Sequence, residues 1–248
     1  MLAVDLGIID YGTALDIQTR AHQLRSMSWK EDILFVMEHK PVLTMGKRGG
    51  DDDLLVTESE LIERDIPLYR LNRGGKITCH YPGQLVAYPV MGVEKFQGDI
   101  PRFVYMLEDV IIQTLAAFGA EGRRIPEHRG VFVGSDKIAS IGIEVRQNVT
   151  MHGISLNVLD DLRLYNLFIP CGIRDKGVTS LEKVCSSGVV LSLESVKLTF
   201  LSHFARAFRE DVPTLIDRDE FEKHCLKAWE CFSAKSPQQS AEIIFEQG

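Results

Sequence analysis

Apolar residues recur at helical spacing in several parts of this chain. Ala14, Ile17, Ala21 and Leu24 fall on one face of a helix that we expect over about 12–28. Further helices are expected from Pro101 to a stop at Gly119, from Ser192 onward, and over about 218–232. The pattern therefore predicts helices near both ends and in the middle of the chain.

Short apolar runs between these helices predict β-strands. They are expected at about 33–37, 66–71, 85–91, 131–133, 137–143 and 149–158. The turn Gly134-Ser135-Asp136 indicates that two of them form a hairpin. Hairpins dominate the middle of the chain and no regular βαβ alternation occurs. We therefore expect an α+β fold with a mixed or antiparallel sheet flanked by helices, rather than a doubly wound sheet.

The length and composition fit one folded domain. A chain of 248 residues with 45% apolar and 25% charged residues is typical of a soluble globular protein. We expect a single domain over 1–232 and a polar tail with weak ordering signals over 233–248. A net charge of −7 argues against a general nucleic-acid binder. Local basic clusters, such as Arg123, Arg124 and Arg129, remain candidates for contact with an acidic partner.

The cysteines and the apolar runs bear on location and cofactors. Five widely spaced cysteines form no Cys-x-x-Cys pair, so neither a zinc knuckle nor a thioredoxin-like motif is expected. No signal-peptide pattern and no run of about eighteen apolar residues occurs, so we expect no membrane span and a cytoplasmic location with reduced thiols. Dinucleotide and Walker A motifs are absent, and the seven histidines form no ligand cluster, so the sequence offers no argument for a metal.

The segment 73–84 combines a twin glycine, a Pro-Gly turn and several polar or basic side chains, between two apolar runs. A loop that only reverses the chain needs two or three turn residues. Glycine serves where a backbone bends unusually or approaches a ligand closely. We therefore expect this segment to be a loop that forms part of a binding site.

Cys171 is the strongest candidate for a nucleophile among the cysteines. It stands between Pro170 and Gly172, which would hold it on a rigid bend, although a small hydrophobic side chain under a turn is the alternative. A thiolate needs a nearby cation or base. Lys137, at the start of a strand, His152 and His80 are the candidates, and their spacing does not choose among them.

Four separated blocks together resemble the lipoyl(octanoyl) transferase family. They are the residues 73–85, 137–142, 152–157 and 170–173, in this order. Members of that family move an octanoyl group from acyl carrier protein onto lysines of lipoyl domains. The resemblance extends over about 5–210 and implies the fold of lipoate and biotin protein ligases, a mixed sheet flanked by helices.

The resemblance also implies residue roles and partners. Cys171 becomes the nucleophile that carries the acyl thioester, and Lys137 becomes the group that lowers the pKa of this thiol and serves as general acid and base. The acyl-binding positions fall on Arg73, Gly74, Gly75, Lys76, Ile77, Thr78, Cys79 and His80, on Ser140, Ile141 and Gly142, and on Gly153, Ile154 and Ser155. Octanoyl-acyl carrier protein would be the donor. Lipoyl domains of 2-oxoacid dehydrogenase complexes and the glycine cleavage H protein would be the acceptors. A monomer without ATP, metal, nucleic acid or membrane is expected.

The chain departs from the family pattern at a few positions. Cys79 stands where the family usually has Tyr, Tyr81 where it has Gly, and Ser155 where it has Ala, so we expect Cys79 and Tyr81 to affect the choice of acyl length. The rival readings are an ATP-dependent lipoate or biotin ligase, a non-catalytic binder of acyl groups or lipoyl domains, and a cysteine hydrolase that uses His152. The twin glycine, the run from His80 to Gln84 and Cys171 argue against the ligases, and Cys171 with Lys137 argues against the non-catalytic binder. The hydrolase remains a third alternative.

Overall fold

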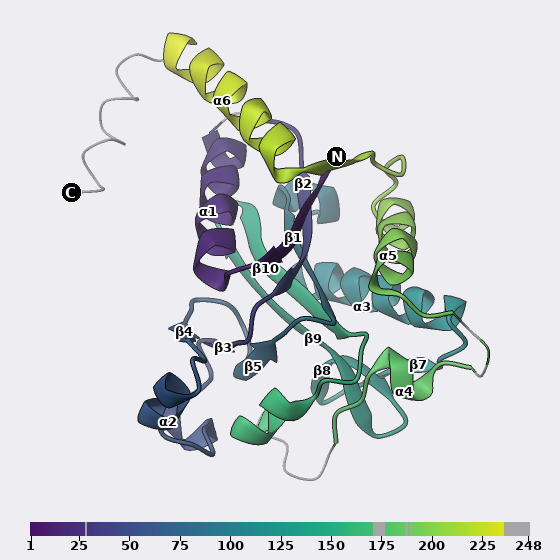
Figure 1. The fold of residues 1–248 in the computed structure, drawn as a ribbon. Coiled ribbons are helices and arrows are strands. Elements are labelled where there is room, and N and C mark those ends of the chain that lie inside the picture. The colour runs from purple at the N-terminus through teal and green to yellow at the C-terminus, as the bar shows by residue number, and fades with distance from the viewer. Residues whose placement is uncertain (28, 171–176, 187, 189, 236–248) are drawn as a thin grey trace.

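The centre of the molecule is an eight-stranded mixed sheet (Figure 1). The computed structural model describes residues 1–27, 29–170, 177–186, 188 and 190–235. In spatial order the strands are β11 (Leu215–Asp217), β1 (Leu2–Ile9), β2 (Ile33–His39), β6 (Gln84–Val90), β10 (Val149–Asn157), β9 (Asp136–Arg146), β8 (His128–Val133) and β7 (Gly122–Ile125). Strand β1 runs parallel to β2 and β11, whereas the remaining neighbours are antiparallel. The expected mixed sheet is therefore confirmed.

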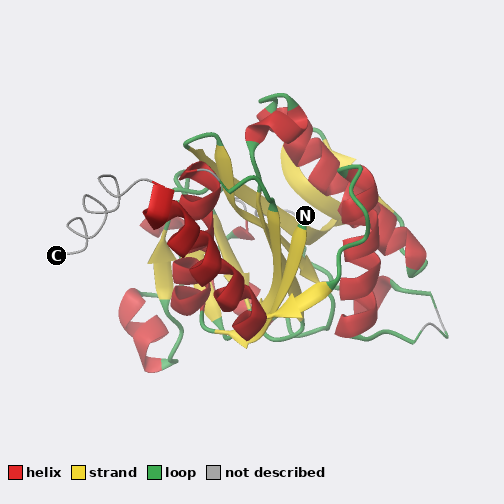
Figure 2. Cartoon of the chain, turned by 90° about the horizontal axis from the view of Figure 1, so that it is seen from above, coloured by secondary structure: helices red, strands yellow, loops and turns green. Residues whose placement is uncertain are grey.

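Helices cover both faces of this sheet, as the view from above shows (Figure 2). They are α1 (Tyr11–Met27) and α6 (Arg218–Lys235) on one face, and α3 (Ile100–Ala117) and α5 (Leu193–Ala207) on the other. Side chains alternate along each strand, so Leu34 and Val36 of β2 pack toward α3 and α5, while Ile33 and Phe35 pack toward α1 and α6. No helix among the described residues is long and apolar enough to cross a membrane.

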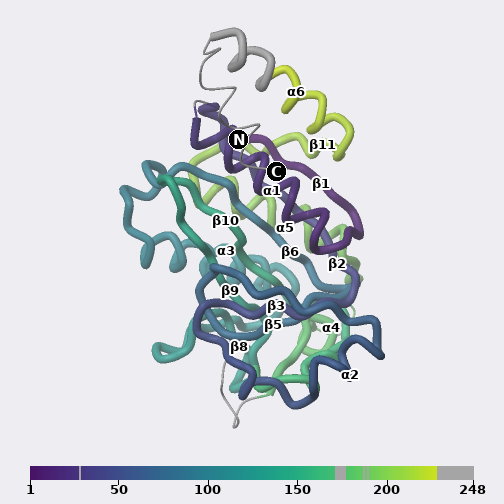
Figure 3. The backbone as a smooth tube through the Cα atoms, turned by 90° about the vertical axis from the view of Figure 1, so that its left-hand side faces the viewer, coloured from purple at the N-terminus to yellow at the C-terminus, as the bar shows by residue number. Residues whose placement is uncertain are grey.

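A smaller three-stranded sheet lies beside the large one (Figure 3). Its strands are β4 (Leu68–Arg70), β3 (Val42–Met45) and β5 (Ile77–His80), and the short helix α2 (Glu58–Glu63) lies next to it in the chain. The single-turn helices are η1 (Asp51–Asp53), η2 (Val93–Phe96), η3 (Arg163–Leu167) and α4 (Leu181–Val184). A separate hydrophobic cluster, which includes Leu43, Tyr81 and Phe168, holds this part together.

The segment 73–84 is only partly a loop. Residues Ile77–His80 form β5, which pairs antiparallel with β3, so the prediction of one continuous loop is wrong for these residues. Their pairing partner lies far away in the chain and was not predicted either. Strands β1 and β11 were also missed, because β1 is interrupted by Asp5 and Gly7 at a bulge and β11 is very short. The last helix ends at Lys235, beyond the predicted end.

Candidate active site

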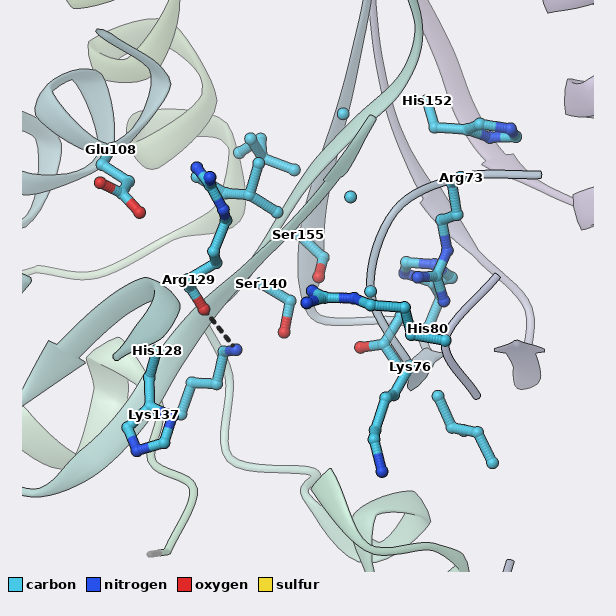
Figure 4. A pocket seen from close by; sticks show the side chains of 18 of the residues that line it. Arg73, Lys76, His80, Glu108, His128, Arg129, Lys137, Ser140, His152 and Ser155 are labelled. Atoms are coloured by element: carbon cyan, nitrogen blue, oxygen red, sulfur yellow. Dashed lines mark hydrogen bonds between the residues drawn. The ribbon is translucent and has the colours of Figure 1, made fainter. Parts of the chain in front are cut away.

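A cavity of about 470 Å³ opens where the two sheets approach each other. Residues of β5 and of the preceding loop line it on one side, and residues of β9 and β10 line it on the other. In the close view (Figure 4), Lys137, His128 and Arg129 lie at one end, Arg73, His80 and His152 at the other, and Ser140 and Ser155 between them. The cavity is therefore elongated along the β9–β10 pair.

The antiparallel pairing of β9 and β10 brings two of the predicted segments together. Ser140 pairs with Ser155, Ile141 with Ile154, and Gly142 with Gly153, and all of these residues line the cavity. Gly142 also lets the loop before β5 come close, since a Cβ on it would lie 2.7 Å from the backbone oxygen of Gly74. The amide of Gly74 donates to the Ile143 carbonyl at 2.9 Å, which fastens this loop to β9.

Most residues of the third predicted segment line the same cavity. Those that do are Arg73, Gly75, Lys76, Ile77, Thr78 and His80, whereas Gly74 and Cys79 do not. The Cys79 side chain is 0% exposed and belongs to the hydrophobic cluster of the smaller sheet, because alternation along β5 turns it away from Thr78 and His80. Tyr81 lies in that cluster as well. Direct contact of Cys79 or Tyr81 with an acyl chain in this cavity is therefore not supported.

Lys137 is held firmly at the start of β9. It is 5% exposed, and its Nζ donates a hydrogen bond to the Arg129 carbonyl at 2.8 Å. Its backbone amide donates to the Gly177 carbonyl and its carbonyl accepts from the Thr179 amide, both at 2.9 Å. Cys171 lies outside the described residues. Gly177 is the first described residue after Cys171 in the sequence, and its carbonyl accepts the hydrogen bond from the Lys137 amide.

Comparison with known proteins now identifies the family. The model of the lipoyl protein ligase A/B catalytic domain matches residues 10–205. A protein of Maridesulfovibrio salexigens named octanoyltransferase is 40% identical over 207 residues, which cover 84% of this chain and 96% of that protein. The octanoyltransferase of a Thermoanaerobacter species is 42% identical and covers 82% of this chain and 88% of its own. The chain belongs to the octanoyltransferase family.

Solved structures agree on the fold at much lower identity. A putative lipoate protein ligase of Thermoplasma acidophilum with bound lipoic acid superposes with a TM-score of 0.70 at 18% identity, covering 94% of this chain and 96% of that one. A lipoate-protein ligase A bound with ATP gives the same score and identity, with 94% and 95% covered. The α+β fold shared with lipoate ligases, which the sequence resemblance implied, is thus confirmed.

Two histidines that line this octanoyltransferase-family site, His80 and His152, and the neighbouring His39 are poor bases. Burial, followed by the charge of Arg73, lowers the pKa of His152 to about 3. Burial also lowers the pKa of His39 to about 4 and that of His80 well below its usual value. Bases this weak remove a thiol proton inefficiently near pH 7. The lowered pKa values therefore argue against His80 and His152 as the group that activates the thiol.

The inner end of the cavity contains groups that sequence reasoning missed. Tyr11 of α1 and Tyr88 of β6 line it together with His80 and His152. The Tyr11 and His80 rings are stacked at 6.0 Å, and the Tyr88 hydroxyl lies 3.0 Å from Nε2 of His39. These residues come from separate elements, and no local pattern connects them. Tyr11 begins α1 and Tyr88 lies inside β6, so neither position singles out a site residue.

Arg73 places a buried positive charge in the cavity wall. It is 7% exposed, and its guanidinium donates to the Thr44 carbonyl at 2.6 Å, to the Thr44 hydroxyl at 2.7 Å and to the Gly74 carbonyl at 3.0 Å. These hydrogen bonds connect the loop to β3. Arg73 thereby fixes the position of the twin glycine next to β9.

Several other positively charged side chains also line the cavity. Arg48, Lys76, Arg124 and Arg129 contribute to its lining, although the whole chain carries a net charge of −7. Lys76 pairs with Asp53 at 2.8 Å. Arg48 and Arg129 are exposed and have no ion pair with any residue that the structure describes. Positive charge is thus concentrated around the cavity.

Proposed function

We propose that this chain transfers an octanoyl group from acyl carrier protein to the acceptor lysine of lipoyl domains, through a thioester on Cys171. The observation that carries the proposal is the position of Lys137 at one end of an elongated cavity lined by paired residues of β9 and β10. Membership of the octanoyltransferase family supports it. The acceptors are the lipoyl domains of 2-oxoacid dehydrogenase complexes and of the glycine cleavage H protein, and the reaction takes place in the cytoplasm, where thiols remain reduced.

The length of the cavity wall suits an acyl chain of eight carbons. A strand rises about 3.3 Å per residue, so β9 advances about 17 Å from Lys137 to Gly142. An extended octanoyl group is about 9 Å long, at roughly 1.3 Å per carbon–carbon bond. The remaining length accommodates the lysine side chain and the thioester. The chain would thus begin near the Ser140–Ser155 pair, pass the Gly142–Gly153 pair and end near His152.

In the first step, the Cys171 thiolate attacks the carbonyl carbon of the octanoyl thioester. The tetrahedral intermediate collapses, the carbon–sulfur bond to phosphopantetheine breaks, and this sulfur leaves as a thiol after taking up a proton. The Lys137 ammonium stabilises the thiolate and supplies that proton, which fits its buried position in the cavity wall.

In the second step, the amine of the acceptor lysine attacks the acyl-enzyme. A carbon–nitrogen bond forms, the thioester bond to Cys171 breaks, and the amine loses one proton, which Lys137 accepts in its neutral form. An amide is more stable than a thioester, so both steps proceed without ATP. No metal is required by this chemistry.

The cations near the cavity suit the proposed donor. Phosphopantetheine carries a phosphodiester, and arginine binds phosphate oxygens through several N–H groups. Arg48 and Arg129 are exposed cavity residues, so they are the candidates for this contact.

The deciding experiment mixes the protein with octanoyl-acyl carrier protein and withholds the acceptor. Mass spectrometry should find one octanoyl adduct, located on Cys171, and adding an apo lipoyl domain should discharge it without ATP. Cys171→Ser should abolish the discharge. An unchanged rate in Cys171→Ser would overturn the mechanism, and a requirement for ATP would assign the chain to the ligases instead.

A further inference from the structure

A buried carboxylate of α3 faces the cavity near Lys137. Glu108 is 7% exposed and is among the cavity-lining residues. Its Oε2 accepts a hydrogen bond from Nε of Arg124 at 2.8 Å, and its Oε1 accepts one from the Gly130 amide at 3.1 Å. The carboxylate is therefore paired with a cation and bonded to the backbone of β8.

The peptide group that Glu108 contacts is the same one that Lys137 contacts. The Gly130 N–H and the Arg129 carbonyl belong to one peptide unit, and the Arg129 carbonyl accepts the hydrogen bond from Nζ of Lys137 at 2.8 Å. A negative charge at the N–H end and a positive charge at the oxygen end polarise this peptide in the same sense. The two hydrogen bonds therefore strengthen each other.

Gly130 leaves the space that this arrangement needs. Its φ is +112°, a value that residues with a side chain rarely adopt. A Cβ at this position would lie 2.9 Å from Cε and 3.2 Å from Nζ of Lys137, and 2.4 Å from the Ala139 oxygen. The lysine thus occupies space that any other residue at position 130 would fill.

The charged groups around Glu108 come from several elements. Arg124 of β7 also donates to Asp109 at 2.5 Å and to the Tyr105 carbonyl at 2.8 Å, both on α3. Lys137 of β9 lies on the other side of the Arg129–Gly130 peptide, where it donates to the Arg129 carbonyl. Arg124 therefore attaches β7 to α3, whereas Glu108 alone among these carboxylates reaches the peptide that holds Lys137.

We propose that Glu108 is a positioning residue that holds the Lys137 ammonium in the cavity through the Arg129–Gly130 peptide. Its effect on acyl transfer depends on the function proposed above, whereas its effect on Lys137 does not. The chain provides a matched control in Asp109, which pairs with the same arginine from the next position of α3 but has no contact with Gly130 among the described residues.

The test compares Glu108→Ala, Glu108→Gln and Asp109→Asn with the wild type. One hydrogen bond to a charged group corresponds to roughly a tenfold change in rate, so kcat for octanoyl transfer should fall roughly tenfold in Glu108→Ala. KM for the octanoyl donor should stay within about twofold, because the bond orients Lys137 and does not bind the donor. Glu108→Gln keeps an acceptor for the Gly130 amide and should lose only about threefold, while Asp109→Asn should match the wild type.

A second measurement follows Lys137 directly, by the exchange of its ammonium protons with water in proton–nitrogen correlation spectra. Exchange should be faster in Glu108→Ala, intermediate in Glu108→Gln and unchanged in Asp109→Asn. Equal exchange in all four proteins would overturn the inference, even if octanoyl transfer is found. If the wild type transfers no octanoyl group, the proposed function fails, and the exchange measurement still decides whether Glu108 positions Lys137. Should Glu108→Ala not fold, Glu108→Gln, which has nearly the same shape, carries the test.

Discussion

Cys79 carries the same functional group as Cys171, the proposed nucleophile, but its surroundings argue against reactivity. The Cys79 side chain is completely buried among apolar residues, and this burial raises the pKa of its thiol far above the ordinary value. A thiol in such an environment stays neutral and unreactive at neutral pH. The position of Cys79 next to His80 in the sequence therefore gives a misleading impression of reactivity.

The burial of Cys79 predicts how its thiol responds to an alkylating reagent. Iodoacetamide should leave Cys79 unmodified in the folded protein, as peptide mass spectrometry would show, and should modify it once the protein is denatured. Cys79→Ala should still form the octanoyl adduct on Cys171. Modification of Cys79 at the same rate in the native and the denatured protein would contradict the burial argument.

Gly130 is the other residue whose identity is decided by its surroundings. Gly130→Ala combines an unfavourable φ with a close contact to the Lys137 side chain, so we expect a loss of roughly 1–3 kcal/mol in the free energy of unfolding. The rate of octanoyl transfer should fall by more than the smaller fraction of folded protein explains, because the added methyl group displaces the Lys137 side chain. Urea denaturation and kcat measured on the folded fraction separate the two effects. Gly134→Ala is the control, since it also has positive φ, at 57°, but no atom lies within 4 Å of its Cβ position. Equal kcat in the two variants would argue against displacement of Lys137.

At the scale of elements, neutral histidines connect the strands around the inner end of the cavity. His39 ends β2, His80 ends β5 and His152 lies in β10. Nδ1 of His39 lies 3.1 Å from the Ile9 carbonyl, and Nδ1 of His80 lies 2.7 Å from Oε1 of Gln84. Protonating these rings would place charges in an environment that is almost without water.

The pKa values of these histidines predict acid sensitivity of the fold. The pKa of His39 is about 4 and that of His152 about 3 in the folded protein, both lowered mainly by burial. The unfolded chain, with histidine pKa values near 6.5, therefore binds more protons below pH 6.5, and stability falls with pH from there until about pH 4 and 3 are reached. Each of the two should contribute a loss of about 1 kcal/mol between pH 6.5 and 5.5.

Urea denaturation at these two pH values tests the expectation. His39→Gln should be less stable at both pH values, because its hydrogen bonds are altered, but it should show a smaller difference between them. The same pH difference in His39→Gln and in the wild type would mean that His39 is not neutral and buried in solution.

The elements also show how far the sequence leads. The long strands β9 and β10 were predicted because apolar and small residues alternate over many positions, and the register of their pairing places 140–142 opposite 153–155. The local sequence predicts a loop at β5 because the stability of this strand depends on β3, a partner distant in the sequence. For the same reason no local pattern indicates that Glu108 of α3 reaches Gly130, since helical periodicity indicates a buried face but not the strand beneath it. Local patterns thus predict elements, whereas contacts between them require the folded chain.

At the scale of the whole molecule, the net charge is negative, whereas several arginine and lysine residues line the cavity. A net charge of −7 repels an acidic partner in general, while Arg48 and Arg129 beside the cavity attract it locally. If an acidic carrier protein is the donor, kcat/KM should fall as salt increases. At 0.1 M salt, ions largely screen the attraction between exposed charges that are more than about 10 Å apart. A small thioester such as octanoyl-pantetheine should depend less on salt.

Reversing the charge of one of these arginines is a more specific test of the local attraction. Arg129→Glu should lower kcat/KM with octanoyl-acyl carrier protein roughly tenfold, mainly through KM, and should affect octanoyl-pantetheine far less. Lys223→Glu makes the same change of charge on the exposed side of α6, outside the cavity lining, and should behave like the wild type. An equal loss of kcat/KM in both variants would show that the net charge of the protein, rather than the local charge beside the cavity, controls association with the carrier protein.

The position of β1 between β2 and β11 also affects how the protein is made. Strand β1 (Leu2–Ile9) leaves the ribosome long before Leu215–Asp217, which covers its outer edge. Throughout synthesis this edge therefore exposes unpaired backbone groups that are able to join another chain. The large sheet can be completed only after residues 215–217 have been translated, so a nascent chain that is interrupted before residue 215 remains prone to aggregation.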